Sequence, residues 1–437
     1  MSETTLNSGE AEGVAQVGGD TNVRIAADTS APISRGERVR VIDVLRGFAL
    51  FGILAVNMAA FRGPVFGEAG AAVSLPDRAA TFLVAFLFEQ KFYVLFSFLF
   101  GYGLSVQMAR AAARGARFAP RFLRRLLGLF LIGLAHALLL YTGDILVTYA
   151  LLGVVLLLFR NAPDRFLLLA ATSLVALSAL AFALGGVVFS SGAPVARADL
   201  LADARQSVEA YRGTPVEVVA QRFREYPGTL GFALAGQGPT ALAMFFVGLW
   251  AGRRRLFERL DRYRTALIQT LKIGLAVGGT GALIWAIQHT VSGFSFDAPF
   301  FLASAADFAT APFLSAVYLA SIALLYGMPG WRRILESLAP VGRMALSNYL
   351  LQSLVAAFVF TGYGLGLYGK VGAAAGLGLS LVIFGVQIPL SAWWLSRFDF
   401  GPAEWALRSF TYGRLQTLRF STSRKKPAPG PSSPNVP

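Results

Sequence analysis

The sequence of 437 residues contains no cysteine and two histidines, His136 and His289. The absence of cysteine excludes disulfides, a thiol nucleophile and a zinc-thiolate site. Because the histidines are far apart in the sequence, we expect no metal site built on histidine. The chain also lacks the motifs of phosphate-binding loops, dinucleotide-binding folds and Ser-His-Asp hydrolases. We therefore expect no metal and no permanently bound cofactor.

Charged residues are scarce as well, at 14% of the chain, whereas hydrophobic residues make up 55% and the mean hydropathy is +0.58. Apolar runs of about twenty residues recur, which is the signature of transmembrane helices. The predicted fold class is all-α, a polytopic integral membrane protein in the lipid bilayer with about ten spanning helices. The net charge of +15 does not indicate a nucleic-acid partner, because the arginines are concentrated in loops that flank apolar runs.

The apolar runs and the basic loops together predict a topology. All dense arginine clusters fall on one side of the membrane when the loops are assigned alternately, and the positive-inside rule makes that side cytoplasmic. Both termini are then cytoplasmic, and the protein is expected in the cell (plasma or inner) membrane. The spans are expected at about 41–61, 81–108, 126–140, 145–159, 166–188, 239–251, 266–287, 300–325, 344–360 and 373–395.

The chain is expected to have two helical halves between polar tails. Residues 1–37 and 420–437 are predicted to be disordered, and no cleavable signal peptide is expected. The halves are residues 38–189 and 237–419, with five spans each. Between them, residues 190–236 form the long polar insertion, expected to be an extracytoplasmic loop with an amphipathic helix at 208–226 on the outer surface.

The first span carries an unusual polar stripe. On an α-helix Asp43, Arg46 and Asn57 fall within roughly 60° of one another. An ionisable residue in a spanning helix costs about 3 kcal/mol unless it is paired or faces a cavity. Asp43 and Arg46, at i and i+3, are able to pair. The stripe is predicted to face a wet pocket, where the pair either fixes the helix register or binds an anion such as the phosphates of acyl-coenzyme A.

Four stretches carry distinctive polar patterns: Arg-x4-Asp-x2-Arg-Gly-x-Ala at 38–57, His-to-Gly-Asp-Ile-Leu at 136–146, and the C-terminal stretches at 340–353 and 400–413. Together they resemble the YeiB family of bacterial membrane proteins. The last two are similar to the family's domain of unknown function, number 418, and the likeness extends over 38–419. The first helix is also distantly similar to heparan-glucosaminide N-acetyltransferase-like and acyltransferase-3 proteins. In the acyltransferase-3 pattern a histidine follows the arginine by eleven residues, and Asn57 stands there in this sequence.

That resemblance implies acyl transfer across the membrane, with cytoplasmic acyl-coenzyme A as donor substrate and a small-molecule, lipid-linked or glycan acceptor. His136 is then the candidate general base on the acceptor, and the alternative is a helix-packing histidine. Asp144 is a candidate orienting carboxylate or the N-terminal cap of the next helix. A straight helix would leave these two residues about 12 Å apart, so that contact requires the intervening turn to fold back.

Three further polar residues complete the candidate site. Lys91 is a candidate substrate contact, or marks the interface where the second span enters the bilayer after an interfacial helix. Asn348 and Gln352, at i and i+4, are expected to make interhelical hydrogen bonds or to contact substrate. His289 is expected to be solvated in an outer loop. The leading hypothesis is a membrane acyltransferase; the alternatives are a transporter of a small anionic or lipid-linked compound, or a non-catalytic membrane partner, and a homo-oligomer is left open.

Overall fold

A computed structural model of the chain describes residues 40–64, 74–115, 117–191, 197–292 and 297–418. The predicted tails at 1–37 and 420–437 lie outside these residues. Helices account for all the regular elements in the described ranges, which confirms the all-α prediction. The elements are α1 (Arg40–Arg62), α2 (Leu75–Leu87), α3 (Lys91–Ala113), α4 (Phe118–Leu139), α5 (Leu146–Leu158), α6 (Asp164–Ser191), α7 (Arg197–Arg212), α8 (Pro215–Phe232), η2 (Ala233–Gln237), α9 (Gly238–Arg253), η3 (Leu256–Glu258), α10 (Leu260–Ser292), α11 (Ala298–Tyr326), α12 (Pro329–Glu336), α13 (Ala339–Arg343), α14 (Ala345–Phe360), α15 (Ala373–Arg397) and α16 (Pro402–Tyr412).

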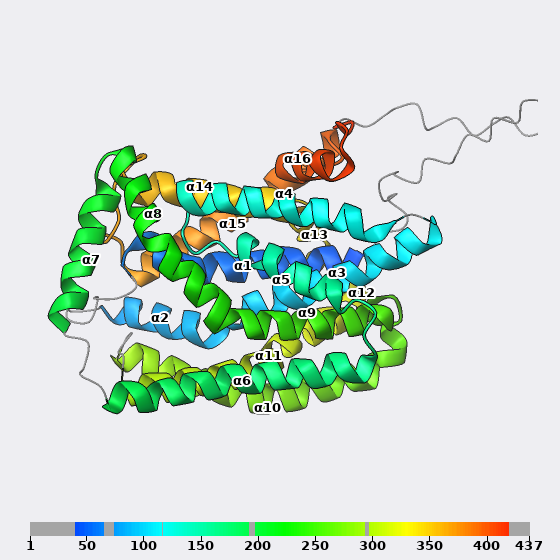
Figure 1. The fold of residues 1–437 in the computed structure, drawn as a ribbon, viewed down its shortest axis with the longest axis horizontal. Coiled ribbons are helices and arrows are strands. Elements are labelled where there is room, and N and C mark those ends of the chain that lie inside the picture. The colour runs from blue at the N-terminus through cyan, green and yellow to red at the C-terminus, as the bar shows by residue number, and fades with distance from the viewer. Residues whose placement is uncertain (1–39, 65–73, 116, 192–196, 293–296, 419–437) are drawn as a thin grey trace, which may run out of the picture.

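The long helices run side by side along one axis (Figure 1). Among the described residues, eight helical segments are long and apolar enough to cross a membrane, and α5 and α14 are shorter apolar helices. Each predicted span falls on one of these segments, so the prediction of a multi-span membrane protein is confirmed. The number of crossings and the sides of the termini stay predictions.

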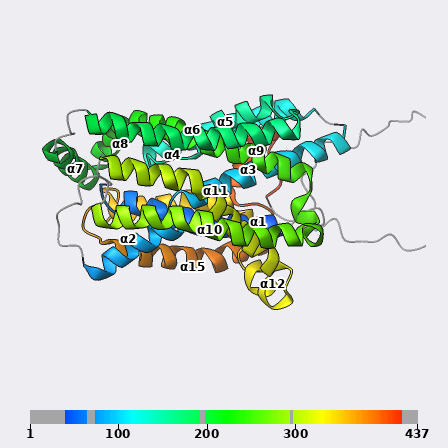
Figure 2. The ribbon, with the colours of Figure 1, turned by 90° about the horizontal axis from the view of Figure 1, so that it is seen from below.

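The two ends of the bundle differ in charge. One end, called the basic end here, carries the junction of α3 and α4, the junction of α9 and α10, and the helices α12 and α16. Figure 2 shows α12 projecting from the bundle at this end. At the opposite end α7 lies across the helix axes in both views.

The second expected span is a broken helix. Residues 88–90 interrupt it between α2 and α3, and Gln90 takes a left-handed backbone conformation with φ 61°. Two α11 side chains donate to carbonyls beside the break: Tyr318 Oη to Leu87 O, at the end of α2, at 2.6 Å, and Ser315 Oγ to Lys91 O, at the start of α3, at 2.7 Å. α2 packs along α10 and α15; its expected place at the membrane interface stays a prediction.

The polar insertion is helical almost throughout its described part. Thr214 caps α8 by a reciprocal capping box with Glu217, and Pro215 occupies the first turn, where its missing N–H costs nothing. α8 then continues through the π-helical turn η2 directly into α9, so that Pro215–Arg253 forms one 39-residue helical segment. The predicted sixth span is therefore the second half of a longer helix, and the predicted amphipathic helix is part of α7 and α8.

Small residues let the central helices approach closely. α3 packs along α9, and a Cβ added at Gly101 would lie 2.0 Å from Phe245 O. A Cβ at Gly342 of α13 would lie 1.8 Å from Asp43 O of α1. Side chains at these two positions would force the helices apart, which is the packing that small residues permit between membrane helices. This packing fixes α1 and α3, the helices that carry the candidate site.

Candidate active site

A cavity of about 390 Å³ lies at the basic end between α1, α3, α4, α14 and α16. Seven arginines line it against two carboxylates, Asp43 and Glu404. The arginines are Arg46, Arg110, Arg114, Arg121, Arg125, Arg343 and Arg408. The walls further along the helices are apolar and include Leu50, Ile53 and Leu129. The cavity thus combines a strongly cationic part with an apolar part, which suits an amphiphilic anion.

Two residues of the α1 stripe line this cavity. Arg46 Nη1 lies 3.5 Å from Asp43 Oδ1, as the i, i+3 spacing predicted. Opposite them on α3 is Gly103, where an added Cβ would come within 3.3 Å of Arg46 Nη2. Asn57, about three turns beyond Arg46 along α1, is half-buried and is not part of the cavity wall. The cationic end of the stripe therefore meets the cavity, and its amide end does not.

His136 and Asp144 form a buried pair behind the apolar part of the cavity. His136 Nδ1 lies 2.8 Å from Asp144 Oδ2, and the two residues are 2% and 3% exposed. Residues 140–145 fold back to make this contact, which closes the 12 Å separation expected of a straight helix. Asp144 Oδ1 also accepts a hydrogen bond from Val147 N at 2.9 Å. One carboxylate thus contacts both the first turn of α5 and the imidazole, and its role in catalysis stays a prediction.

The remaining nitrogen of His136 is available for chemistry. Since Nδ1 faces a carboxylate, the pairing favours the tautomer with its proton on Nδ1 and a lone pair on Nε2. Nε2 is buried and makes no hydrogen bond in the part of the chain that the structure describes. Buried polar atoms are nearly always hydrogen-bonded in folded proteins. An orphaned ring nitrogen beside a carboxylate is the arrangement of a general base awaiting a proton donor.

Tyr349 separates this pair from the cavity. Its ring lines the cavity, and the ring centroid lies 4.9 Å from that of His136. Its hydroxyl is buried and, within the described ranges, makes no hydrogen bond. Ile145 and Leu146, which directly follow Asp144, line the same wall. His136 is thus one side chain away from the cavity space.

Glu404 holds the helix that carries Tyr349. Its Oε1 accepts hydrogen bonds from Leu346 N at 2.7 Å and Ser347 N at 3.1 Å, which caps the first turn of α14 from another helix. Ser347 Oγ donates to Oε2. Burial raises the pKa of the Glu404 carboxyl above its ordinary value, against the opposite effect of these hydrogen bonds. The cavity wall therefore includes a carboxylate that is held by the start of α14.

The other predicted site residues lie elsewhere in the bundle. Lys91 is fully buried in the bundle, 2.8 Å from Asp307 Oδ1, and does not line the cavity. Asn348 Nδ2 donates to Ser391 Oγ at 3.0 Å, and Gln352 Nε2 donates to Gln387 Oε1 at 2.8 Å. These two amides join α14 to α15 by interhelical hydrogen bonds, as predicted. They do not line the cavity. His289 lies within α10, stacked on Trp285 and 3.9 Å from Glu89 Oε1, so the expectation of an outer loop was wrong.

Sequence reasoning did not find Tyr349, Glu404 or Asp307. A signal existed for Asp307, because it is the one charged residue within the apolar helix α11 and so required a partner. Tyr349 and Glu404 lie in the stretches at 340–353 and 400–413 that carry the family resemblance. Neither was singled out, because a tyrosine or a glutamate in an apolar or amphipathic helix is ordinary there.

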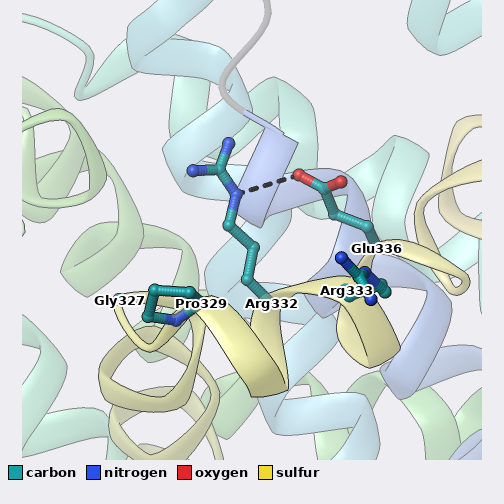
Figure 3. Close-up of a pocket in the computed structure, with 5 residues that line it drawn as sticks. All are labelled: Gly327, Pro329, Arg332, Arg333 and Glu336. Carbon is teal, nitrogen blue, oxygen red and sulfur yellow. Dashed lines mark hydrogen bonds and ion pairs between the residues drawn. The ribbon is translucent and has the colours of Figure 1, made fainter.

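A second, open pocket of about 300 Å³ lies on α12 at the basic end. Figure 3 shows Arg332 and Glu336 facing each other there, with Nε and Oε1 3.0 Å apart. Hydrogen bonding to Arg332 lowers the pKa of the Glu336 carboxyl. This pocket contains none of the predicted site residues, and its ion pair is exposed and weak.

The fold and the site together define an all-α multi-span membrane protein with a cationic cavity and a buried His–Asp pair. A family model described as "Protein of unknown function (DUF418)" matches residues 251–414. The chain is 37% identical over 409 residues to the uncharacterized protein YxaH of Bacillus subtilis, which covers 90% of this chain and 98% of that protein. It is 30% identical over 406 residues to the uncharacterized protein YeiB of Escherichia coli, covering 89% and 100%.

A similar likeness links it to an uncharacterized 39.9 kDa protein of Bacillus acidopullulyticus, at 31% identity over 395 residues, 88% of this chain and 96% of that protein. The chain belongs to the YeiB family.

Proposed function

We propose that this protein is a membrane acyltransferase that takes an acyl thioester, such as acyl-coenzyme A, into the cavity and passes the acyl group to an acceptor near His136. The observation that carries this proposal is the unpartnered Nε2 of His136, fixed by Asp144 beside the wall of an arginine-lined cavity. Neither the cavity nor the pair suggests this chemistry alone. Together they supply an anion-binding entrance and a base.

The donor fits the division of the cavity into two parts. Arginines bind phosphates through charge-assisted hydrogen bonds, so the phosphates of the donor lie at the basic end. Arg125 and His136 are eleven residues apart on α4, which places the base about 16 Å along the helix from the arginines. The flexible arm of coenzyme A spans that distance in the apolar part. A rotation of the Tyr349 side chain then opens the way between the thioester and His136 Nε2.

The reaction follows from the pair's geometry. His136 Nε2 removes the proton of an acceptor hydroxyl or amine, whose oxygen or nitrogen attacks the thioester carbonyl carbon. The carbon–sulfur bond breaks, and the thiolate that leaves takes the proton from the imidazolium. Asp144 stabilises the imidazolium and holds the ring in place. The products are the acylated acceptor and a free thiol.

Thiol release in nanodiscs tests the proposal. Purified protein is incubated with acetyl-coenzyme A and a membrane or glycan extract as acceptor, and free thiol is measured. We expect His136→Gln to lower turnover by about 10²–10⁴-fold while acyl-coenzyme A still stabilises the protein thermally. Since the chain has no cysteine, its own thiols add no background. Equal turnover by wild type and His136→Gln would remove His136 from the reaction.

One observation favours transport as a second candidate function. Discontinuous helices with intramembrane charges mark substrate paths in transporters, and the α2–α3 break carries the buried Lys91–Asp307 pair. Uptake of a labelled anion into proteoliposomes, without covalent change and lost in the Lys91→Met/Asp307→Leu double variant, supports this alternative. Thiol release that depends on His136 supports the enzyme.

A further inference from the structure

Arg222 of α8 is a buried cation at the opposite end of the bundle from the arginine-lined cavity. The residue is 2% exposed. Its Nη1 donates to Leu139 O, the last residue of α4, and to Tyr363 Oη at 2.9 Å. Tyr363 Oη in turn donates to Leu139 O at 2.8 Å. The arginine thus closes a three-membered contact between α8, the end of α4 and the segment after α14.

Both partners of this guanidinium are neutral. In the part of the chain that the structure describes, Arg222 makes no ion pair, although buried arginines normally have a counter-charge. The nearest acid on the same helix, Glu225, is engaged by Ser207, Tyr211 and Gln221. A buried cation without a counter-charge is costly in a spanning segment, and the cost disappears when an anion binds.

The geometry leaves the anion-binding edge of Arg222 open. All its hydrogen bonds to described residues come from Nη1, so Nε and Nη2 have none. These two nitrogens form the fork that binds a carboxylate or phosphate with two parallel hydrogen bonds. The guanidinium carbon lies 5.6 Å from the Tyr211 ring centroid and 5.1 Å from that of Tyr363. Two rings therefore hold the fork in position by cation–π contact.

The fork lies near the proposed base. Leu139, which accepts from Arg222, is three residues after His136 on α4, about 4.5 Å along the helix. Tyr226, one turn after Arg222 on α8, has a buried hydroxyl that makes no hydrogen bond within the described ranges. An acceptor bound at Arg222 thus has its neighbouring groups within reach of His136 from the end that the positive-inside rule places outside.

α8 also has the means to admit such a ligand. Pro227 interrupts its hydrogen bonding five residues after Arg222, and a Cβ added at Gly228 or Gly231 would contact nothing within 4 Å. The π-helical turn η2 follows at Ala233–Gln237. Proline and π-helical turns are where helices bend. Pro227 and η2 thus place two potential bend points between Arg222 and α9.

We propose that Arg222 binds an oxyanion, a phosphate or a carboxylate, of the acyl acceptor. The bound anion takes both hydrogen bonds of the Nε–Nη2 edge and places a hydroxyl or amine of the same molecule against His136. The assignment of this anion to the acceptor rests on the proposed acyl transfer; the anion site itself rests on the geometry of Arg222 alone. The anion comes from a lipid headgroup or from a water-soluble compound.

A fluorescent label on a single introduced cysteine tests the site without an activity assay. Leu365 is 60% exposed and two residues from Tyr363, so Leu365→Cys takes an environment-sensitive dye in a chain without other cysteines. The labelled protein is titrated with inorganic phosphate in neutral detergent, with chloride at matched ionic strength. A second arm compares nanodiscs of phosphatidylglycerol with nanodiscs of phosphatidylcholine. The variants are Arg222→Ala, Arg222→Lys and the control Arg224→Ala, an exposed arginine on the same helix.

We expect a saturable dye response in the unchanged protein and in Arg224→Ala. Arg222→Ala should weaken it by about tenfold or more, and Arg222→Lys by less, because lysine keeps the charge and loses the fork. A response to phosphate identifies a water-soluble source, and a response confined to phosphatidylglycerol identifies a lipid headgroup. No response in either arm, or equal responses in Arg222→Ala and Arg224→Ala, overturns the anion site. An intact response in a protein without acyl transfer refutes the proposed function alone.

Discussion

Replacing Lys91 by methionine should destabilise the protein strongly, because it leaves Asp307 as a buried charge without a partner. The two side chains are 0% and 1% exposed. Lys91 Nζ lies 2.8 Å from Asp307 Oδ1 and 3.1 Å from Oδ2, and it also donates to Ala85 O at 3.1 Å near the end of α2. The ammonium group thus donates one hydrogen bond to the Asp307 carboxylate and one to a backbone carbonyl.

Breaking a buried pair by removing one partner typically costs about 3–5 kcal/mol, whereas replacing both partners by apolar residues is often neutral. We therefore expect Lys91→Met to lower the apparent melting temperature and Lys91→Met/Asp307→Leu to recover most of it. The recovery is incomplete, because Ala85 O loses its donor in both variants.

The assay is the fraction of protein that stays monodisperse on size-exclusion chromatography after heating in detergent. Lys272→Met is the control, because Lys272 is exposed on α10 and undergoes the same chemical change. Equal stability of Lys91→Met and Lys272→Met would refute the reasoning, as would a double variant no more stable than Lys91→Met.

Three further predictions concern the cavity and the His–Asp pair. Asp144→Asn should lower thiol release more than it lowers acyl-coenzyme A binding, measured by turnover and thermal shift, because it removes the stabilisation of the imidazolium. Arg46→Gln should weaken acyl-coenzyme A binding by about tenfold, measured by thermal titration, and Arg264→Gln, on the exposed start of α10, should not. Burial raises the pKa of the Glu404 carboxyl, so this group binds its proton more tightly in the folded than in the unfolded protein. Its contribution to stability is then greatest below its ordinary pKa of 4.5 and is lost as pH rises through the folded pKa, so Glu404→Gln should flatten the melting-temperature profile over that window.

The fold class and the pairing of Asp43 with Arg46 could be predicted because they depend on local spacing. Apolar runs long enough to span are visible without any tertiary information, and residues at i and i+3 share a face in every α-helix. Asn57 was placed on the same face by the same geometry. The cavity nevertheless ends before it, because the extent of a void depends on side chains from other helices.

Contacts across long sequence separations could not be predicted in this way. Lys91 and Asp307 are 216 residues apart, so the sequence offered no reason to pair them, and Lys91 resembled a residue at a membrane interface. His136 and Asp144 are only eight residues apart in the sequence, yet their contact depends on how residues 140–145 fold back. The spacing allowed the contact without requiring it. Arg222 is harder still, since two of its neighbours, Leu139 and Tyr363, come from distant segments.

The cap that Glu404 places on α14 has a consequence for how the two ends of the cavity communicate. Tyr349 lies about one turn after the two backbone amides that donate hydrogen bonds to Glu404. The Tyr349 side chain, which lies in front of His136, is therefore positioned by α16, a helix outside the spanning segments. A ligand that draws Glu404 toward itself competes for the bonds that order the start of α14. Substitutions in α16 should therefore change the position of the Tyr349 side chain without contacting it. A helix outside the spanning segments thus influences the interior of the bundle.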